Sequence, residues 1–419
     1  MSSLLLRNVV LDGSTVNVLI RGNRFHSISQ SLPADPADET LDAHGNLAIL
    51  PAFYNAHTHA AMSLLRGYAD DLDLFDWLSN HIWPVEARLT NEDVYAGTRL
   101  AILEMIKSGT VFFNDMYWRG RQVVKAAEEM GMRACVGILR QTMGNPAFLP
   151  MLDNDWLLEN CKNISDRVQI SVAPHAIYTT TEEILRDVAD TAKKHGLVIH
   201  THLAETKKEF DDCMEQHGMS PTAYVDRCGI LTDRTILAHS VALTDDDIEL
   251  LAERRSVLVH MPISNMKLVS GHFRYDSAAL FGKCRWAIGT DGASSNNSLS
   301  MLGEMKTAAL RGKDLTGDPK AMKAADVFRA ATQSGAEAFG IDAGVIEEGR
   351  LADCMLVDLN NQNLVPGFNL VSDMVYAADS SCVDTVICDG RILMRGGRVD
   401  GEDEIIAEAR EAAKRLTGR

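Results

Sequence analysis

The sequence has no cysteine pair spaced C-x-x-C, no long apolar run and no excess of basic residues. Its 419 residues include 41 basic and 58 acidic side chains, which gives a formal net charge of −17. Such a charge repels phosphate backbones and anionic lipids, so nucleic acids and membrane surfaces are disfavoured as partners. The start, MSSLLLR, holds too short an apolar run for a signal peptide, and no stretch approaches the length of a membrane span. These absences predict a soluble, cytoplasmic protein.

The eight cysteines lack the close spacing that a zinc knuckle or a thioredoxin motif needs. A disulfide framework would also require an exported protein, which the start of the chain does not suggest. Apolar residues make up 46% and charged residues 24% of the chain, as in an ordinary globular protein rather than a disordered or fibrous one. We therefore expect the cysteines to be small, mostly buried side chains without a chemical role.

The order of segments in the middle of the chain predicts a barrel of eight parallel strands. Short apolar runs alternate with amphipathic helical stretches between residue 47 and about residue 340, and the predicted strands are 48–55, 110–115, 133–138, 168–173, 197–202, 235–238, 257–261 and 285–289. An open, doubly wound sheet is the alternative, but no G-x-G-x-x-G motif follows the first strand. Eight alternations favour a (β/α)8 barrel, in which chemistry takes place where the strands end.

Both ends of the chain are predicted to form short strands joined by turns. The predicted strands are 4–11, 16–20 and 25–28 near the start, and 354–358, 385–388 and 391–395 near the end. Each set is too small to bury a core of its own, so we expect them to pair into one small β domain. The predicted units are a composite β domain of residues 1–53 and 345–400, a barrel of residues 54–344, and a charged C-terminal helix at 401–419.

The most informative short motif is NAHTH at residues 55–59. Residues two apart on a strand face the same side, so His57 and His59 can reach one point at the end of the first barrel strand. Two such imidazoles can ligate a metal ion. With 13 histidines in the chain, one H-x-H pair is a weak signal by itself.

Polar residues at the ends of later strands strengthen the metal interpretation. His202, His239 and Asp291 end predicted strands five, six and eight, so their side chains would face the same barrel mouth. Three imidazoles and a carboxylate suit zinc or iron and leave a position open for water. His200 lies two residues before His202 and so faces the same side of the strand, and we place its side chain one layer deeper in the barrel than that of His202. We expect His260, at the end of strand seven, to be structural.

These segments, in this order, resemble the amidohydrolase superfamily. The matching strings are PAFYNAHTH (51–59), SVAPHAIYT (171–179), HTHLAET (200–206), ILAHS (236–240), HMPISNMKL (260–268), AIGTDGASSNNSL (287–299) and GVIEEGRLADCMLVD (344–358). Together with IWPVEARLT (82–90), they are most similar to the 5′-methylthioadenosine/S-adenosylhomocysteine deaminases. The likeness spans nearly the whole chain and implies an α/β fold, a (β/α)8 TIM barrel with a small β-sandwich domain formed from both chain ends.

The resemblance implies a metal-dependent hydrolytic deaminase. Its substrate would be an adenine nucleoside (5′-methylthioadenosine, 5′-deoxyadenosine, adenosine or S-adenosylhomocysteine), converted to the inosine analogue and ammonia. Carried over position by position, the metal ligands would be His57, His59, His202 and Asp291. One divalent ion is implied, zinc first and iron(II) second, because the bridging lysine of the binuclear members has no counterpart in SVAPH at 171–175.

The same resemblance assigns the remaining site residues. Glu205 matches the family's proton-shuttling glutamate and His239 its polarising histidine, while Asp291 would accept a proton from the attacking water. Glu86 and His175 match positions that hold the nucleoside, with the glutamate on the ribose hydroxyls. From the sequence alone, Glu86 would be interpreted as an exposed charge before a helix.

One departure concerns the two arginines that grip the amino-acid carboxylate of S-adenosylhomocysteine in the family. Arg140 could supply one of them with a shift of two positions, and the second has no counterpart. Losing a bidentate carboxylate partner disfavours that substrate relative to the other three. The segment 60–88, with Trp77 and Trp83, is expected to be either a lid or a subunit contact, and we expect a homo-oligomer.

Two other functions remain as alternatives at this point. The first is hydrolysis of another nitrogen heterocycle, namely guanine, 8-oxoguanine or a triazine. Glu205 favours protonation of a ring nitrogen over triazine hydrolysis, and Glu86 favours a ribose over a free base. The second is a non-catalytic binding protein on the same fold, which the presence of all four predicted metal ligands disfavours.

Overall fold

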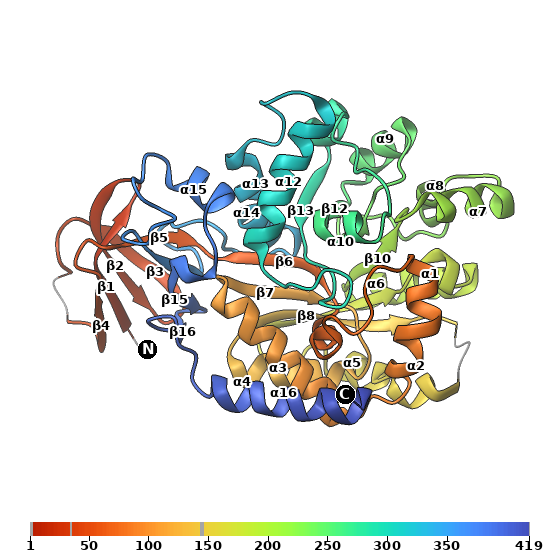
Figure 1. Ribbon diagram of the computed structural model, residues 1–419, viewed down its shortest axis with the longest axis horizontal. Coiled ribbons are helices and arrows are strands. Elements are labelled where there is room, and N and C mark those ends of the chain that lie inside the picture. Colours follow the sequence, from red (N-terminus) through yellow and green to blue (C-terminus); the bar gives the residue numbers. More distant parts are fainter. Residues whose placement is uncertain (1–2, 34–35, 143–145, 419) are drawn as a thin grey trace.

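Eight parallel strands form the central barrel of the computed structural model, which describes residues 3–33, 36–142 and 146–418 (Figure 1). Neighbouring strands follow the order of the sequence, and the strands are β6 (Phe53–Thr58), β7 (Thr110–Asp115), β8 (Arg133–Arg140), β9 (Val168–Pro174), β10 (Val198–Leu203), β11 (Thr235–His239), β12 (Val257–His260) and β13 (Arg285–Ile288). The peptide N–H groups of Thr290 and Asp291, just past β13, donate to the carbonyl of His57 on β6. These bonds bring the last strand against the first, and the predicted barrel is confirmed.

Helices cover the outside of the barrel, and their ends follow from local sequence. The covering helices include α3 (Asn91–Lys107), α4 (Gly120–Met130), α5 (Asn154–Asn160), α6 (Glu182–His195), α7 (Lys207–His217), α8 (Pro221–Arg227), α9 (Asp245–Arg254), α10 (Pro262–Lys267), α11 (Ala278–Lys283), α12 (Met301–Thr316), α13 (Ala324–Ala331) and α14 (Gln333–Ala338). Thr90, Thr181, Thr206 and Thr244 cap helix starts by accepting a peptide N–H bond. None of the helices in the described ranges is long and apolar enough to cross a membrane.

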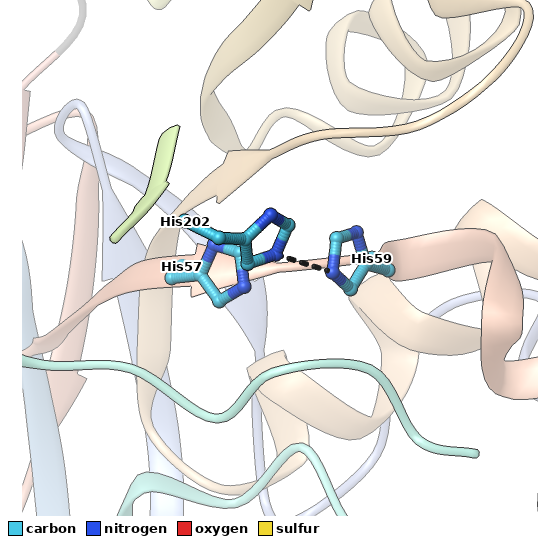
Figure 2. A group of neighbouring side chains, drawn as sticks. All are labelled: His57, His59 and His202. Carbon is cyan, nitrogen blue, oxygen red and sulfur yellow. Dashed lines mark hydrogen bonds between the residues drawn. The ribbon is translucent and has the colours of Figure 1, made fainter. Parts of the chain in front are cut away.

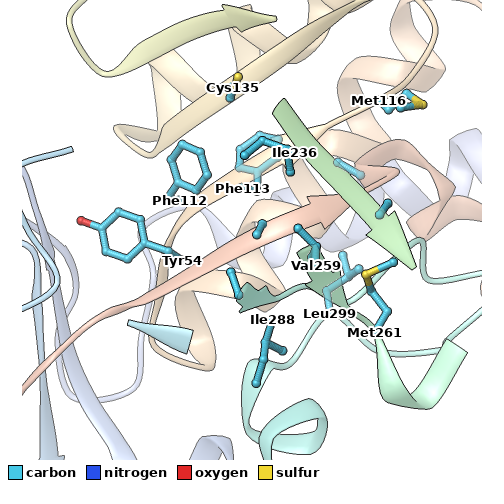
Figure 3. Packing of buried hydrophobic residues seen from close by; sticks show 14 of the residues in the cluster. Tyr54, Phe112, Phe113, Met116, Cys135, Ile236, Val259, Met261, Ile288 and Leu299 are labelled. Atoms are coloured by element: carbon cyan, nitrogen blue, oxygen red, sulfur yellow. The ribbon is translucent and has the colours of Figure 1, made fainter. Parts of the chain in front are cut away.

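Large apolar side chains fill the barrel interior away from its mouth. Tyr54 on β6 stacks on Phe112 of β7 with ring centroids 5.6 Å apart, and both side chains are fully buried. Figure 3 shows these two rings in one packed cluster with Phe113 of β7, Ile236 of β11 and Val259 of β12. Because this part of the core is apolar, the polar strand residues gather at the carboxyl ends of the strands.

The predicted first strand, residues 48–55, is in fact two strands that belong to different sheets. β5 (Leu47–Pro51) pairs antiparallel with β14 (Cys354–Asp358), whereas the barrel strand β6 begins at Phe53. The two strands are contiguous in sequence and similarly buried, so hydrophobicity alone shows no boundary between them. Because β6 extends to Thr58, His57 lies inside the first barrel strand, whereas the predicted strand ended at residue 55.

The two ends of the chain form one mixed sheet beside the barrel, shown in red and blue in Figure 1. Its other strands are β1 (Ser3–Leu11), β2 (Ser14–Arg21), β3 (Arg24–Ser29), β4 (Glu39–Asp42), β15 (Val383–Cys388) and β16 (Arg391–Met394). The order is β16-β15-β14-β5-β1-β2-β3, with β4 paired to β1. This sheet has its own apolar core, which includes Leu6, Val18, Phe25 and Leu356. A β domain made from both ends is confirmed, while the short polar strand β4 was not predicted.

A buried ion cluster joins this sheet to the barrel. The guanidinium of Arg133, at the start of β8, lies 2.7 Å from the carboxylate of Asp353 and 2.6 Å from that of Asp389. The hydroxyl of Tyr54 donates to Asp353 as well. Removing one partner of a buried pair leaves an uncompensated charge, which costs about 3–5 kcal/mol. The cluster therefore fixes the sheet against the amino-terminal ends of the barrel strands.

The C-terminal helix α16 (Glu402–Thr417) leaves the sheet and packs along α3 of the barrel (Figure 1). Lys107 contacts Glu402 at 2.9 Å, and Arg415 contacts Asp93 at 3.0 Å, so an ion pair holds each end of the helix.

All eight cysteines lie in described parts of the chain and none is paired, which agrees with the prediction from their spacing.

Candidate active site

Three imidazoles meet at the mouth of the barrel (Figure 2). His57 lies near the end of β6, His59 follows the strand, and His202 lies on β10. The possible ligand atoms of these three residues lie within 4.8 Å of one another. The carboxylate of Asp291, just past β13, places Oδ1 3.5 Å from Nε2 of His57 and 3.3 Å from Nε2 of His59. The structure therefore brings together the four residues that the sequence predicts as metal ligands.

The hydrogen bonds around these imidazoles suit a divalent cation. Nδ1 of His59 donates to the carbonyl of Met116, and Nδ1 of His202 donates to the carbonyl of His175, each over 2.6 Å. With a proton on Nδ1, the two Nε2 atoms face each other with lone pairs at 3.3 Å. Such lone pairs repel unless a cation lies between them, and ligating histidines usually donate their other nitrogen in this way. Nε2 of His57 is buried without a hydrogen-bond partner among the described residues.

The charge state of the four residues also fits a metal. Burial lowers the pKa of His57 to about 4 and the pKa of His202 well below its usual value, so both are neutral at pH 7. Burial alone would raise the pKa of Asp291, but the neighbouring imidazoles of His57, His59 and His239 lower it below its ordinary value. Neutral imidazoles and an ionised carboxylate are the forms that bind metal ions.

A carboxyl–imidazole pair lies beside the candidate metal ligands. Nε2 of His239 is 3.8 Å from a carboxyl oxygen of Glu205, and Nδ1 of His239 bonds Oδ1 of Asn265 over 2.8 Å. Burial raises the pKa of Glu205 above its usual value. Burial by itself would lower the pKa of His239, but the carboxylates of Glu205 and Asp291 raise it. Glu205 therefore keeps its proton to a higher pH than an exposed glutamate does.

The backbone around Glu205 is fixed by a second buried carboxyl group. Glu209, on the first turn of α7, accepts the peptide N–H groups of Ala204 and Glu205 over 3.0 and 2.8 Å. Ala204 has a positive φ of 50°, which a residue other than glycine adopts only when its surroundings hold it there. Glu209 thus stabilises the turn that aims Glu205 into the cavity.

The other two barrel-mouth histidines lie where the sequence analysis placed them. His200 is fully buried behind the ligands, with Nε2 2.8 Å from Nδ1 of His57. His260 bonds the hydroxyl of Tyr275 over 2.6 Å and stacks on Phe273, so its contacts are structural.

The segment 60–88 covers the cavity above these groups. It forms η1 (Ala60–Leu65), α1 (Leu74–Asp76), the π-helix η2 (Trp77–Ile82) and α2 (Trp83–Glu86). Six of its side chains line the cavity, namely Met62, Leu74, Trp77, Leu78, Trp83 and Glu86. Of the two roles expected for this segment, the structure supports that of a lid.

Glu86 and His175 lie in the same cavity as the candidate metal ligands His59, His202 and Asp291. Glu86 is 3% exposed, so its interpretation as a surface charge is wrong. One of its carboxyl oxygens accepts the indole N–H of Trp118 over 3.3 Å, and the other has no hydrogen-bond partner among the described residues. Burial raises the pKa of Glu86 to about 7 and lowers that of His175 to about 3. Nδ1 of His175 lies 3.0 Å from the hydroxyl of Thr179.

Arg140 does not reach the cavity, contrary to the prediction. Its side chain turns toward α6, where Nε lies 3.8 Å from the carboxylate of Asp187, while the residues on either side, Leu139 and Gln141, line the cavity. Successive residues of a strand point to opposite sides, so Arg140, at the end of β8, faces the helical layer.

Most of the residues that line an outer chamber next to the cavity were not identified from the sequence. Trp83, Gln141 and Tyr178 line both spaces, and the outer chamber is completed by Ser79, Pro84, Thr142, Phe148 and Thr179. Phe148 stacks on Trp118 with ring centroids 4.4 Å apart, which connects the chamber wall to the partner of Glu86. From the sequence, Gln141 could have been placed at the cavity only by continuing the alternation of side chains along β8 beyond the last residue of that strand.

The chain resembles known proteins along most of its length. A 5′-deoxyadenosine deaminase of Methanospirillum hungatei is 46% identical over 91% of this chain and 86% of the relative. A 5-methylthioadenosine/S-adenosylhomocysteine deaminase of Archaeoglobus fulgidus is 44% identical over 96% of this chain and 95% of the relative. A solved adenosine deaminase from Xanthomonas campestris with bound zinc is 33% identical, covers 100% of this chain and 98% of its own, and superposes with a TM-score of 0.91.

The family model for the amidohydrolase family matches residues 48–393, which include every strand of the barrel. The match and the identities above extend over far more than half of the chain. The protein therefore belongs to the amidohydrolase family.

Proposed function

We propose that the protein is a metal-dependent deaminase that converts an adenine nucleoside and water into the inosine analogue and ammonia. The observation that carries this proposal is one cavity with two kinds of group. Glu205, a buried carboxyl group with a raised pKa, lies beside converging imidazoles, and the buried Glu86 has a carboxyl oxygen without a hydrogen-bond partner among the described residues. The named activities of the two relatives at 44–46% identity, both of which are deaminases of adenine nucleosides, support this assignment.

His57, His59, His202 and Asp291 would hold one divalent ion, zinc in the first instance. When bound, such an ion supplies a Lewis acid that makes hydroxide available near neutral pH. The single compact set of ligand atoms supports one ion. The zinc in the solved relative supports its identity.

The chain's own residues would move the protons. Asp291 is ionised and can take a proton from the attacking water. Glu205, whose pKa is raised by burial, can donate a proton to the ring nitrogen N1 as the neighbouring carbon becomes tetrahedral. His239, held by Asn265, stabilises the charge that develops on the attacking oxygen. The bond between the ring carbon and the amine then breaks as the amine takes the proton held by Asp291 and leaves as ammonia. The new hydroxyl group returns a proton to Glu205 and becomes the carbonyl oxygen of the product.

Glu86 would select a nucleoside over a free base. Its unpartnered oxygen can accept a ribose hydroxyl, and Trp118 holds the other oxygen in place. A site built to bond hydroxyl groups rejects analogues that lack them, because its buried polar groups are then left unpaired. This feature favours adenine nucleosides over guanine, 8-oxoguanine and triazines.

The outer chamber would receive the 5′ substituent, and it favours a small uncharged one. Among the described residues, the eight that line the chamber are uncharged, and Arg140 lies outside. Burying a zwitterionic tail without charged partners is unfavourable. We therefore place 5′-deoxyadenosine and 5′-methylthioadenosine ahead of S-adenosylhomocysteine.

A substrate panel tests the proposal. Zinc-loaded protein is given adenosine, 5′-deoxyadenosine, 5′-methylthioadenosine, S-adenosylhomocysteine, adenine, guanine and a triazine, and ammonia release is measured. We expect the uncharged nucleosides to have the highest kcat/KM. Efficient turnover of guanine or a triazine without turnover of nucleosides would replace this function with the alternative. No turnover at all by metal-loaded protein would favour a binding protein.

A further inference from the structure

We propose that His200 is a positioning residue that holds the ring of the metal ligand His57, an inference that rests on the metal site proposed above. Nε2 of His200 lies 2.8 Å from Nδ1 of His57, and both side chains are fully buried. His200 has no ligand atom in the set of converging groups. It would therefore act on the metal only through His57.

His57 is the one proposed imidazole ligand whose orientation depends on another side chain. His59 and His202 donate to the backbone carbonyls of Met116 and His175, which remain whatever the side chains there are. His57 has instead the imidazole of His200 as the partner of its Nδ1. A ligating imidazole is oriented by the bond of its other nitrogen, and loss of such a partner typically lowers metal affinity about 10–100-fold.

The order of protons along the two rings follows from metal binding. To offer a lone pair at Nε2, neutral His57 must carry its proton on Nδ1 and donate it to His200. His200 then accepts at Nε2 and carries its own proton on Nδ1. That Nδ1 atom is buried and has no partner among the described residues.

A buried N–H group without a partner costs about 1–3 kcal/mol, so packing alone gives no reason for an imidazole at this position. An apolar side chain would fill the same space without that cost. The contact with His57 explains the imidazole, because it supplies an acceptor in the barrel interior, where no backbone carbonyl is bonded to Nδ1 of His57.

A pair of polar substitutions isolates this contact. In His200→Gln the amide oxygen can occupy the position of Nε2 and accept from His57, whereas in His200→Asn the shorter amide reaches only the position of Nδ1. His260→Gln is the matched control, since His260 is also buried at the barrel mouth but bonds Tyr275. Zinc affinity is measured by competition with a chromogenic chelator, and ligand geometry by the visible absorption spectrum of the cobalt(II)-loaded protein.

We expect His200→Asn to bind zinc about 10–100-fold more weakly than the parent and to alter the cobalt spectrum. His200→Gln and His260→Gln should stay within about threefold of the parent, a margin well below that effect. Equal melting temperatures of the metal-free variants would show that the difference is not one of folding. If His200→Asn does not fold, His200→Leu gives the same comparison with His200→Gln.

Three results would overturn the inference. Parent-like zinc affinity in both His200→Asn and His200→Leu would show that the contact does not matter. Equal losses in His200→Gln and His200→Asn would show that the acceptor at Nε2 is not what is needed. Complete loss of zinc in every His200 variant, with zinc retained in His202→Gln, would make His200 the ligand itself. If the parent protein binds no zinc, the proposed metal site itself is wrong. That outcome is distinct from the three results above, in all of which the parent binds zinc.

Discussion

Replacing Glu86 by glutamine should stabilise the protein at alkaline pH while weakening nucleoside binding. Burial raises the pKa of Glu86 from the ordinary 4.5 to about 7. The folded protein therefore binds this proton more tightly than the unfolded chain does. The associated stability is fully present below pH 4.5, declines as the pH rises, and is lost above about pH 7. Glutamine matches the protonated form in shape and never ionises, so the variant escapes this loss.

The size of the effect follows from the two pKa values. Each pH unit between them corresponds to about 1.4 kcal/mol, so the full difference amounts to about 3 kcal/mol. An unfolding entropy of about 2 cal/mol/K per residue gives about 0.9 kcal/mol/K for a chain of this length. The melting temperature of Glu86→Gln should then exceed that of the parent by about 1 °C at pH 5 and by about 3–4 °C at pH 8.

Scanning calorimetry of parent and variant, both zinc-loaded and free of nucleoside, measures this difference. The exposed residue Glu411 on α16 supplies the control, since Glu411→Gln should leave the melting temperature unchanged at both pH values. Activity is measured in parallel: KM for 5′-deoxyadenosine should rise about 10–100-fold, because bonds to charged groups contribute about 1.5–3 kcal/mol. A shift of melting temperature that is the same at pH 5 and pH 8, or a less stable variant at pH 8, would refute the reasoning.

Three further predictions concern the proposed chemistry. Glu205→Gln should keep its zinc, measured by elemental analysis, but lose about 10²–10⁴ in kcat, and loss of the metal instead would make Glu205 a ligand. Arg140→Ala should change kcat/KM for S-adenosylhomocysteine and for 5′-deoxyadenosine by less than about twofold, since the side chain faces α6. A loss for S-adenosylhomocysteine alone would place Arg140 at the substrate after all. Dialysis against a chelator should abolish turnover, and activity should return fully at about one equivalent of zinc per chain; a requirement for two would contradict the single-ion site.

The candidate metal ligands could be grouped from the sequence because their placement depends on rules that hold at every strand end. His57 and His59 share a strand face, and Asp291 directly follows an apolar run. The carboxyl ends of barrel strands meet in space, so even distant residues could be grouped without knowing the packing. His200 could be placed behind His202 by the same parity.

Other features depend on packing that a single sequence does not display. From the sequence alone Glu86 was interpreted as an exposed charge before a helix, and only the resemblance to a family placed it at the substrate; in the structure it is buried. Arg140 was assigned to the pocket by its place in the chain, yet the end of β8 turns it outward. The division between β5 and β6 was invisible because both strands are apolar, although one pairs with a strand some 300 residues away.

That pairing between β5 and β14 has a consequence for the protein as it leaves the ribosome. β5 ends at Pro51 and its partner begins at Cys354, so the first segments emerge well before the strand that covers their edge. At about 5–20 residues per second, translation of the intervening chain takes about 15–60 s. During that time the edge of β5 is open to other nascent chains, and exposed strand edges favour aggregation. Chains released before β14 is made would keep this edge permanently, so premature termination should yield insoluble protein even when every barrel strand is present.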